Sequence, residues 1–468
     1  MKPTTPVSPL RPASRTLVLF NYDWDALALA EMQARWPHDT AGFDLFSFPS
    51  NARLAWFDME RFVTRLTRQA TRNGWQAVLS NHEQFGALAA ALVAERMGWP
   101  GTPVDAVLAC QHKLHAREVL QRVCPEANLH FARLDARYGG PVPEGLDYPL
   151  FVKPVKAAFS VLARTVSDRA SLHAHTRFGA WELWVIRHLV EPFERIVQQR
   201  LPAAGTAHSL MVEEPMDAPQ YCLDGYVFNG DVRALGCVDA VMYPGTQSFM
   251  RFDYPSRLDP PVQARALDVA RRFLNAIGFS HGFFNMEFFH DPVTDRLSVI
   301  EFNPRLASQF SDLYQRVEGM NLHEAAMALA HGIDPADVPR QTPQAGAASS
   351  LVYRSFSPAR PVSMPDGAKR AEFAKAFPDA LLFEFPKTGD SVTRDFKWLG
   401  SYRYGIVHLG GRDAADLHRR AEHASALLGW PAPYAHHIAA PVHASQREPA
   451  TLFPNHMPHI TQPLETPR

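Results

Sequence analysis

The sequence has few cysteines and no long apolar run. A helix that spans a bilayer needs roughly 20 apolar residues, and no segment of this chain approaches that length. The first residues, MKPTTPVSPLRPASR, also lack the apolar core of a signal peptide. The four cysteines show no metal-ligand spacing and are too few for a disulfide scaffold. We therefore expect a cytoplasmic protein in a reducing compartment, without a membrane partner.

An excess of charge of one sign is also missing. The chain has 47 basic and 48 acidic residues, which gives a formal net charge of -1. Such a balance produces no general attraction to nucleic acid, so no nucleic-acid partner is expected. The first apolar run leads into NYDWD, where a dinucleotide-binding protein would have GxGxxG. This absence argues against a dehydrogenase.

The N-terminal part of the chain alternates between two periodicities. Apolar runs of strand length lie at 16–20, 43–48 and 75–80, and stripes at helical spacing lie at 56–70 and 85–98. Strands that alternate with helices predict a small parallel α/β domain.

The chain, at 468 residues, is too long for one ordinary domain. We predict an α/β and α+β multidomain protein. Its expected parts are a disordered tail at 1–14, the α/β domain at 15–112, a central domain of two α+β subdomains at 113–335, a C-terminal α+β domain at 345–432, and a second tail at 435–468.

The central part reads as a mostly antiparallel sheet with one interrupting helix. FVKP, SLMVEE, CLDGYVF, VRALGCVDAVM and FFNMEFF have the length and pattern of strands. The helix is predicted to begin at Asp259 and Pro260, to bury a stripe from Val262 to Ile277, and to end at Gly278.

One loop in this region looks suited to an anion. FVKPVKAAFSVLARTV, residues Phe151 to Val166, reads as two strands joined by a tight connection. Lys153 and Lys156 lie at the turn, and a lysine inside an apolar strand is rarely left without a partner.

The segment HGFFNMEFFHDPVTDRLSVIEFNPR is predicted to form a hairpin. If it closes symmetrically about Thr294, Glu287 lies opposite Glu301, and Asn303 follows on the same face. Like charges directly across a hairpin are destabilising, so a cation between them is one interpretation. A solvated face with ordinary surface charges is the other. Two carboxylates and an amide oxygen suit Mg²⁺. Arg305 lies two residues after Asn303 and could reach a phosphoryl group beside such an ion.

Four segments, taken in order, resemble the ATP-grasp superfamily. They are HKLHAREVL, FVKPVKAAFSV, MVEEPM, and MEFFHDP followed by IEFNPR. The resemblance covers residues 111–332, and it is weaker over the flanking domains. It implies that ATP is bound with Mg²⁺, or with Mn²⁺ in its place.

The resemblance also implies roles for individual residues. Lys113 and Lys153 would contact the nucleotide phosphates, and Arg305, with Lys153, would act at the reacting phosphate. The remaining residues implied in nucleotide binding are Ser160, Glu213, Glu214, Met216 and Gln220. The residues implied in metal binding are Glu287, Glu301 and Asn303.

The resemblance extends to the L-amino-acid ligases and, more distantly, to biotin carboxylase. It implies an ATP-dependent carboxylate–amine ligase, which activates a small-molecule carboxylate as an acyl phosphate and joins it to an amine, releasing ADP and phosphate. One alternative is a carboxylase of the biotin-dependent or purine type, and another is an ATP-binding protein without catalysis. The sequence leaves open whether the protein forms a homodimer.

Two departures from the family pattern affect this interpretation. Ala157, Ala158 and Phe159 stand where glycines are usual in the flexible flap, so the flap is expected to be stiffer. Gln220 stands where many members have a glutamate for the ribose hydroxyls.

Overall fold

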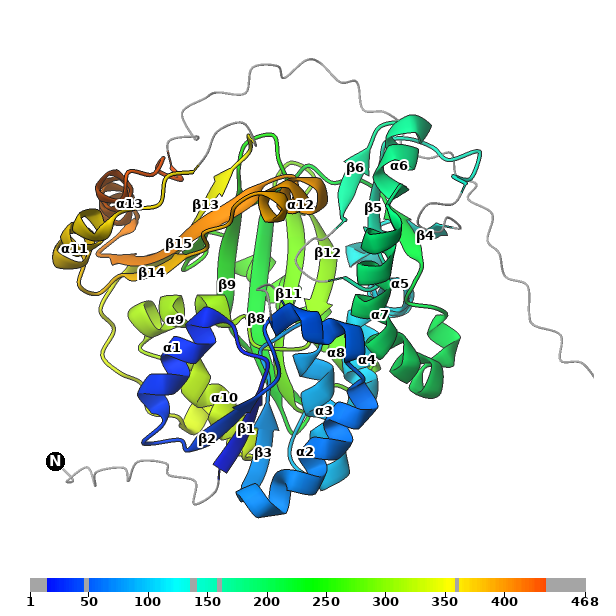
Figure 1. The fold of residues 1–468 in the computed structure, drawn as a ribbon, viewed down its shortest axis with the longest axis horizontal. Helices are drawn as coiled ribbons and strands as arrows, with labels where there is room; N and C mark the ends of the chain where they lie inside the picture. Colours follow the sequence, from blue (N-terminus) through cyan, green and yellow to red (C-terminus); the bar gives the residue numbers. More distant parts are fainter. Residues whose placement is uncertain (1–14, 46–49, 135–140, 158–161, 358–361, 435–468) are drawn as a thin grey trace, which may run out of the picture.

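The computed structural model describes residues 15–45, 50–134, 141–157, 162–357 and 362–434 (Figure 1). Within these residues the strands form three sheets, with orders β2-β1-β3, β4-β7-β5-β6 and β12-β11-β8-β9-β10-β13-β15-β14.

The first sheet is parallel and belongs to the N-terminal part of the chain, as predicted. Its strands are β1 (Arg15–Leu19), β2 (His38–Ala41) and β3 (Trp75–Leu79). The central strand β1 is apolar and buried because it has a neighbour on each side. The helices of this part are α1 (Asp23–Met32), α2 (Met59–Asn73), α3 (Gly86–Met97) and α4 (Val104–Gln111).

Two local predictions in this part were wrong. The second strand is His38–Ala41, and residues 43–45 of the predicted strand 43–48 are not in a strand; residues 46–49 lie outside the described residues. Because β2 is an edge strand, it does not require an apolar sequence. Helix α2 begins at Met59, since Asp58 caps it by accepting from the Arg61 amide at 2.8 Å. Trp56 therefore lies before the helix and is 82% exposed.

The second sheet is antiparallel and contains the loop with two lysines. Its strands are β4 (Phe131–Leu134), β5 (Leu150–Pro154), β6 (Arg164–Val166) and β7 (Leu210–Glu213). β5 and β6 pair as the predicted hairpin, with Leu150 opposite Val166. Helices α5 (Lys113–Val123), α6 (Arg169–Thr176) and α7 (Ala180–Arg200) accompany this sheet in the chain (Figure 1).

The third sheet has eight strands and is antiparallel in all its described pairs. Its strands are β8 (Gln220–Phe228), β9 (Asp231–Met242), β10 (Phe249–Tyr254), β11 (Gly282–Asp291), β12 (Arg296–Asn303), β13 (Ala347–Ser355), β14 (Leu381–Glu384) and β15 (Tyr402–Gly411). The strands predicted for one central sheet are thus divided between two. In addition, β10 pairs with β13, so the C-terminal strands continue the central sheet.

Helices cover both faces of this large sheet (Figure 1). α8 (Pro260–Ala276) follows Asp259 as predicted, and its Phe273 stacks on Phe302 of β12 at a centroid distance of 4.0 Å. α10 (Leu322–Ala330) is buried along its length because it lies between the N-terminal sheet and the large sheet. The other helices are α9 (Ser311–Glu318), α11 (Gly367–Ala376), α12 (Asp390–Leu399) and α13 (Ala414–Leu428). In the part of the chain that the structure describes, no helix combines the length and apolar character that crossing a membrane requires.

Candidate active site

The predicted carboxylate pair lies on the hairpin of β11 and β12. Near the turn Asp291 pairs with Arg296. A hairpin that closed symmetrically about Thr294 would instead pair Asp291 with the next residue, Leu297. A bulge at Ile300 adds one residue to β12, and beyond it Glu287 lies directly opposite Glu301. The predicted register is therefore right at the carboxylates, and the bulge is what produces it.

Polar side chains of neighbouring strands hold Glu287. Gln220 Nε2 on β8 donates to Glu287 Oε2 at 2.8 Å, and Asn303 Nδ2 donates to Oε1 at 3.2 Å. Asn303 Nδ2 also donates to Asn285 Oδ1 at 3.1 Å. Burial and the facing Glu301 carboxylate together raise the pKa of Glu287.

Glu301 has the opposite electrostatic environment. Lys113 Nζ, at the start of α5, lies 2.7 Å from Glu301 Oε2. Burial alone would raise the pKa of Glu301, but the ammonium groups of Lys113 and Lys153 outweigh it and hold that pKa well below its usual range. The two facing acids therefore differ: the charge on Glu301 is stabilised, and the charge on Glu287 needs a further cation.

Lys153 belongs to a buried charge network with Glu213 and Arg117. Lys153 Nζ lies 2.8 Å from Glu213 Oε2, and Arg117 Nε lies 2.6 Å from Glu213 Oε1. Arg117 also donates to the carbonyls of Val299 at 2.6 Å and Ile300 at 3.0 Å. One guanidinium thus fixes both the partner of Lys153 and the bulge that aligns Glu301. Burial lowers the pKa of Lys153 to about 8.

Lys156, the second lysine of the loop that looked suited to an anion, is buried beside the same group of charges. Its Nζ lies 4.8 Å from the centroid of the Phe193 ring, and no carboxylate among the described residues pairs with it. Burial lowers its pKa to about 8, and the charges of Glu83, Glu301 and Arg305 are close enough to act on it. Strand β5 and the loop that follows it therefore bring two lysines to the site, Lys153 from the strand and Lys156 from the loop.

Arg305 pairs with a residue that sequence reasoning missed. Arg305 Nε lies 3.1 Å from Glu83 Oε2, and Gln111 Nε2 donates to Glu83 Oε1 at 2.8 Å. Glu83 follows β3, at the carboxyl end of a parallel strand. Ligand-binding residues gather at this end of open α/β sheets, so this position was a usable signal.

The remaining predicted nucleotide-binding residues are placed as follows. Glu213 is locked in the ion pairs with Lys153 and Arg117. Glu214 accepts from the His130 amide at 3.2 Å and pairs with Arg296. Met216 is partly buried in the connection between β7 and β8. Gln220 donates a hydrogen bond to Glu287. Ser160 lies outside the described residues, but Ala157, at the start of the flap, accepts from Lys113 Nζ at 3.1 Å.

The hairpin set fits a divalent cation with hard oxygen ligands. No cluster of three or more His, Cys, Asp or Glu with metal-binding geometry occurs among the residues that the structure describes. Glu287 and Glu301 supply two carboxylates, and Asn303 lies beside them, with its amide nitrogen donating to Glu287. Mg²⁺ is usually bound in proteins by one or two carboxylates and completes its shell with phosphate oxygens and water. The donor set and the raised pKa of Glu287 match this pattern.

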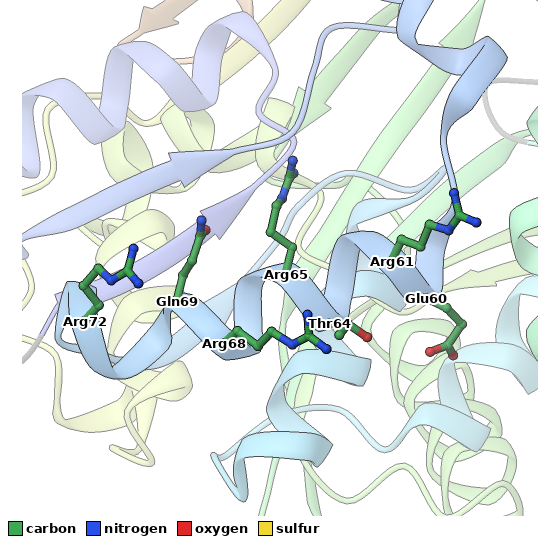
Figure 2. Close-up of a pocket in the computed structure, with 7 residues that line it drawn as sticks. All are labelled: Glu60, Arg61, Thr64, Arg65, Arg68, Gln69 and Arg72. Carbon is green, nitrogen blue, oxygen red and sulfur yellow. The ribbon is translucent and has the colours of Figure 1, made fainter.

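A shallow hollow on α2 is separate from this site. Figure 2 shows its lining, which comes from one helix and includes arginines along a helical stripe: Glu60, Arg61, Thr64, Arg65, Arg68, Gln69 and Arg72. It contains none of the residues of the candidate site.

The Arg117 network leads to a prediction about stability. Arg117→Met should lower the free energy of unfolding by about 3–5 kcal/mol, because it removes one partner of the buried Glu213 charge and leaves two strand carbonyls unpaired. Urea unfolding followed by tryptophan fluorescence measures the change. Arg122→Met is the matched control, since Arg122 is exposed on the same helix, and its effect should stay within about 0.5 kcal/mol. Equal stability of the two variants would contradict the structural role of Arg117.

Comparisons with known proteins place the chain among proteins of similar sequence and fold. No family model matches the chain. An uncharacterized protein of Sinorhizobium fredii is 23% identical over 368 residues, which are 78% of this chain and 70% of that protein. Carnosine synthase 1 of Gallus gallus is 28% identical over 270 residues, which are 54% of this chain but only 27% of the synthase.

Solved structures match over most of the chain. An L-amino acid ligase from Bacillus licheniformis has a TM-score of 0.63 at 15% identity, covering 88% of this chain and 97% of the ligase. A carboxyaminoimidazole ribonucleotide synthase from Aspergillus clavatus, solved with ATP, has a TM-score of 0.60 at 15% identity, covering 89% of this chain and 98% of the synthase. The predicted fold class is confirmed: the chain has the fold of the ATP-grasp superfamily.

Proposed function

We propose that the protein is an ATP-dependent ligase that activates a small-molecule carboxylate as an acyl phosphate and joins it to an amine, with release of ADP and phosphate. The observation that carries this proposal is the pair Glu287 and Glu301, aligned by a bulge beside Lys113 and close to the charges of Lys153 and Arg305. The names of two similar proteins, an L-amino acid ligase and a carnosine synthase, support an amine as the second substrate.

The residues divide the work of phosphoryl transfer as positioned charges. Lys113 and Lys153 approach the site from α5 and β5 and would hold the phosphates of ATP. Arg305 would neutralise charge at the transferring phosphoryl group, a role suited to its planar guanidinium. When bound by Glu287, Glu301 and Asn303, a Mg²⁺ or Mn²⁺ ion would supply further charge neutralisation at the phosphate oxygens.

This chemistry explains why no covalent nucleophile is needed. A carboxylate is a poor acyl donor until its oxygen is converted to a phosphate leaving group. The protein contributes orientation and electrostatic stabilisation, and the acyl phosphate must be kept from water until the amine attacks. Ala157, where the flap begins, accepts a hydrogen bond from Lys113 Nζ, and a flap that closes over the site would exclude water.

The first prediction here uses the two unequal acids. Glu287→Gln and Glu301→Gln should both abolish turnover, because each removes a ligand of the proposed metal. The two substitutions should change the melting temperature of the ligand-free protein in opposite directions. Glu287→Gln should raise the melting temperature, because it removes a charge that burial and Glu301 destabilise. Glu301→Gln should lower it, because it removes the partner of Lys113.

Differential scanning calorimetry in the absence of nucleotide measures the melting temperatures. Release of ADP in the presence of substrates measures turnover. Glu372→Gln, an exposed position on α11, is the control and should change neither quantity. Full turnover in either hairpin variant would contradict the metal assignment.

A second prediction concerns the intermediate. With ATP and carboxylate substrate present and amine absent, hydroxylamine should trap an acyl hydroxamate that mass spectrometry identifies. Measuring ADP release over a panel of carboxylates, each with and without amines, identifies the substrate. ADP release with bicarbonate alone, without any hydroxamate, would favour the carboxylase alternative. No ADP release with any member would favour an ATP-binding protein without catalysis.

A third prediction concerns pH. Lys153 and Lys156 have pKa values lowered to about 8, so both lose their charge well below the usual range for lysine. The neutral amines no longer attract phosphate, so kcat/KM for ATP should fall as the pH rises through about 8. Lys156→Arg keeps its charge in this range and should show a shallower decline. An unchanged kcat/KM up to pH 9.5 in the parent protein would contradict the assignment.

A further inference from the structure

A second pair of like charges lies across strands of the same large sheet. On β13 and β15, Tyr353 pairs with Gly405, but the next pair is Arg354 with Arg403, because a bulge adds Tyr404 to β15. Two arginines directly opposite each other on one face are destabilising unless an anion lies between them. Bulges of this kind commonly re-aim side chains beside functional sites.

Neither arginine has an anionic partner among the described residues. Arg354 donates to the Phe249 carbonyl at 3.2 Å and to the Ser401 hydroxyl at 3.0 Å, both of which are neutral. Arg403 lies over the Phe385 ring at 4.4 Å. By contrast, the buried guanidinium groups of Arg117, Arg251 and Arg316 each pair with a carboxylate.

The charges around the pair leave it cationic. Two acids act electrostatically on the pair. Asp395 on α12 acts on both arginines but already pairs with Lys387 at 2.7 Å. Asp23 on α1 acts on Arg403 alone and forms no ion pair with it among the described residues. Burial lowers the pKa of Arg354 to about 10 and also lowers that of Arg403. Both guanidinium groups nevertheless remain charged at neutral pH, so the site attracts an anion.

The pair lies on the face of β13 that is turned toward the candidate active site. Because alternate residues share a face, Arg354 lies on the same side as Val352 and Ser350. Ser350 accepts from Gln309 at 3.0 Å, and Gln309 follows Arg305 by four residues. Tyr22, on the N-terminal side, is within electrostatic range of both Arg305 and Arg403.

We propose that Arg354 and Arg403 bind a carboxylate group of a substrate that is not the carboxylate activated by ATP. The proposal rests on the ligase function proposed above and makes it more specific. Guanidinium groups bind carboxylates through two parallel hydrogen bonds and so fix the orientation of a substrate. The carboxylate belongs either to an amino acid that serves as the amine or to the far end of a dicarboxylic substrate.

Kinetics with matched substrates test the site and identify which substrate supplies the carboxylate. Each amino acid is compared with its amide as the amine, and each dicarboxylate with the corresponding monocarboxylate as the activated acid. In Arg354→Gln and Arg403→Gln, KM for the substrate with the extra carboxylate should rise about ten- to a hundredfold. KM for ATP and for the amide or monocarboxylate should stay unchanged. Arg403→Lys, which keeps the charge but loses the two-pronged geometry, should fall between.

Arg412→Gln is the matched control, because Arg412 follows β15 directly and its side chain is 82% exposed. Its KM values should equal those of the parent protein. Unchanged KM values in both Arg354→Gln and Arg403→Gln would overturn the proposal.

A binding measurement separates failure of the site from failure of the ligase function. With a non-hydrolysable ATP analogue and Mg²⁺ at saturation, malonate is titrated and the melting temperature followed. Malonate should stabilise the parent and Arg412→Gln more than Arg354→Gln or Arg403→Gln. If no substrate pair releases ADP but this difference is found, the anion site stands and the ligase function fails. Equal stabilisation of all four proteins would overturn the anion site.

Discussion

The buried guanidinium of Arg117 is the contact on which the candidate site depends. It joins three elements that are distant in the sequence: α5, which carries it, β7, which carries Glu213, and β12, whose bulge carbonyls it binds. Because Glu213 also pairs with Lys153, the position of this lysine, which we propose binds phosphate, and the register of the hairpin carboxylates are coupled. Removing a partner from a buried charge network is strongly unfavourable, which keeps this arrangement in place without ligand.

The large sheet carries two like-charge pairs of opposite sign. Glu287 and Glu301 lie on the β11–β12 pair at one end of the strand order, and Arg354 and Arg403 lie on β13 and β15 near the other. In each case a bulge places the two side chains opposite each other. Since both arrangements are unfavourable in the protein alone, both are expected to be stabilised by ligands: a cation at the first, and an anion at the second.

The proposed anion site would give the C-terminal strands a chemical role. A fold does not determine which substrates are used, and the similar structures are named for different ligases and synthetases. The lysines proposed to bind phosphate and the proposed metal ligands would serve a step that such enzymes share. Residues outside that set, such as the arginine pair, are therefore where substrate choice is expected to arise.

Much of the fold and of the site follows from local sequence, and the rest does not. The alternating pattern determined the N-terminal α/β domain, the helix after Asp259 and the hairpin, because each depends on residues close together in the chain. The same closeness placed Glu287 opposite Glu301. The edge strand His38–Ala41 was missed because a strand with one neighbour needs little apolar character. Arg117 and the arginine pair needed the tertiary structure, as did the pairing of Glu83 with Arg305 and the burial of Lys156. Their partners lie on other elements, and local periodicity contains no information about which distant strands and helices meet.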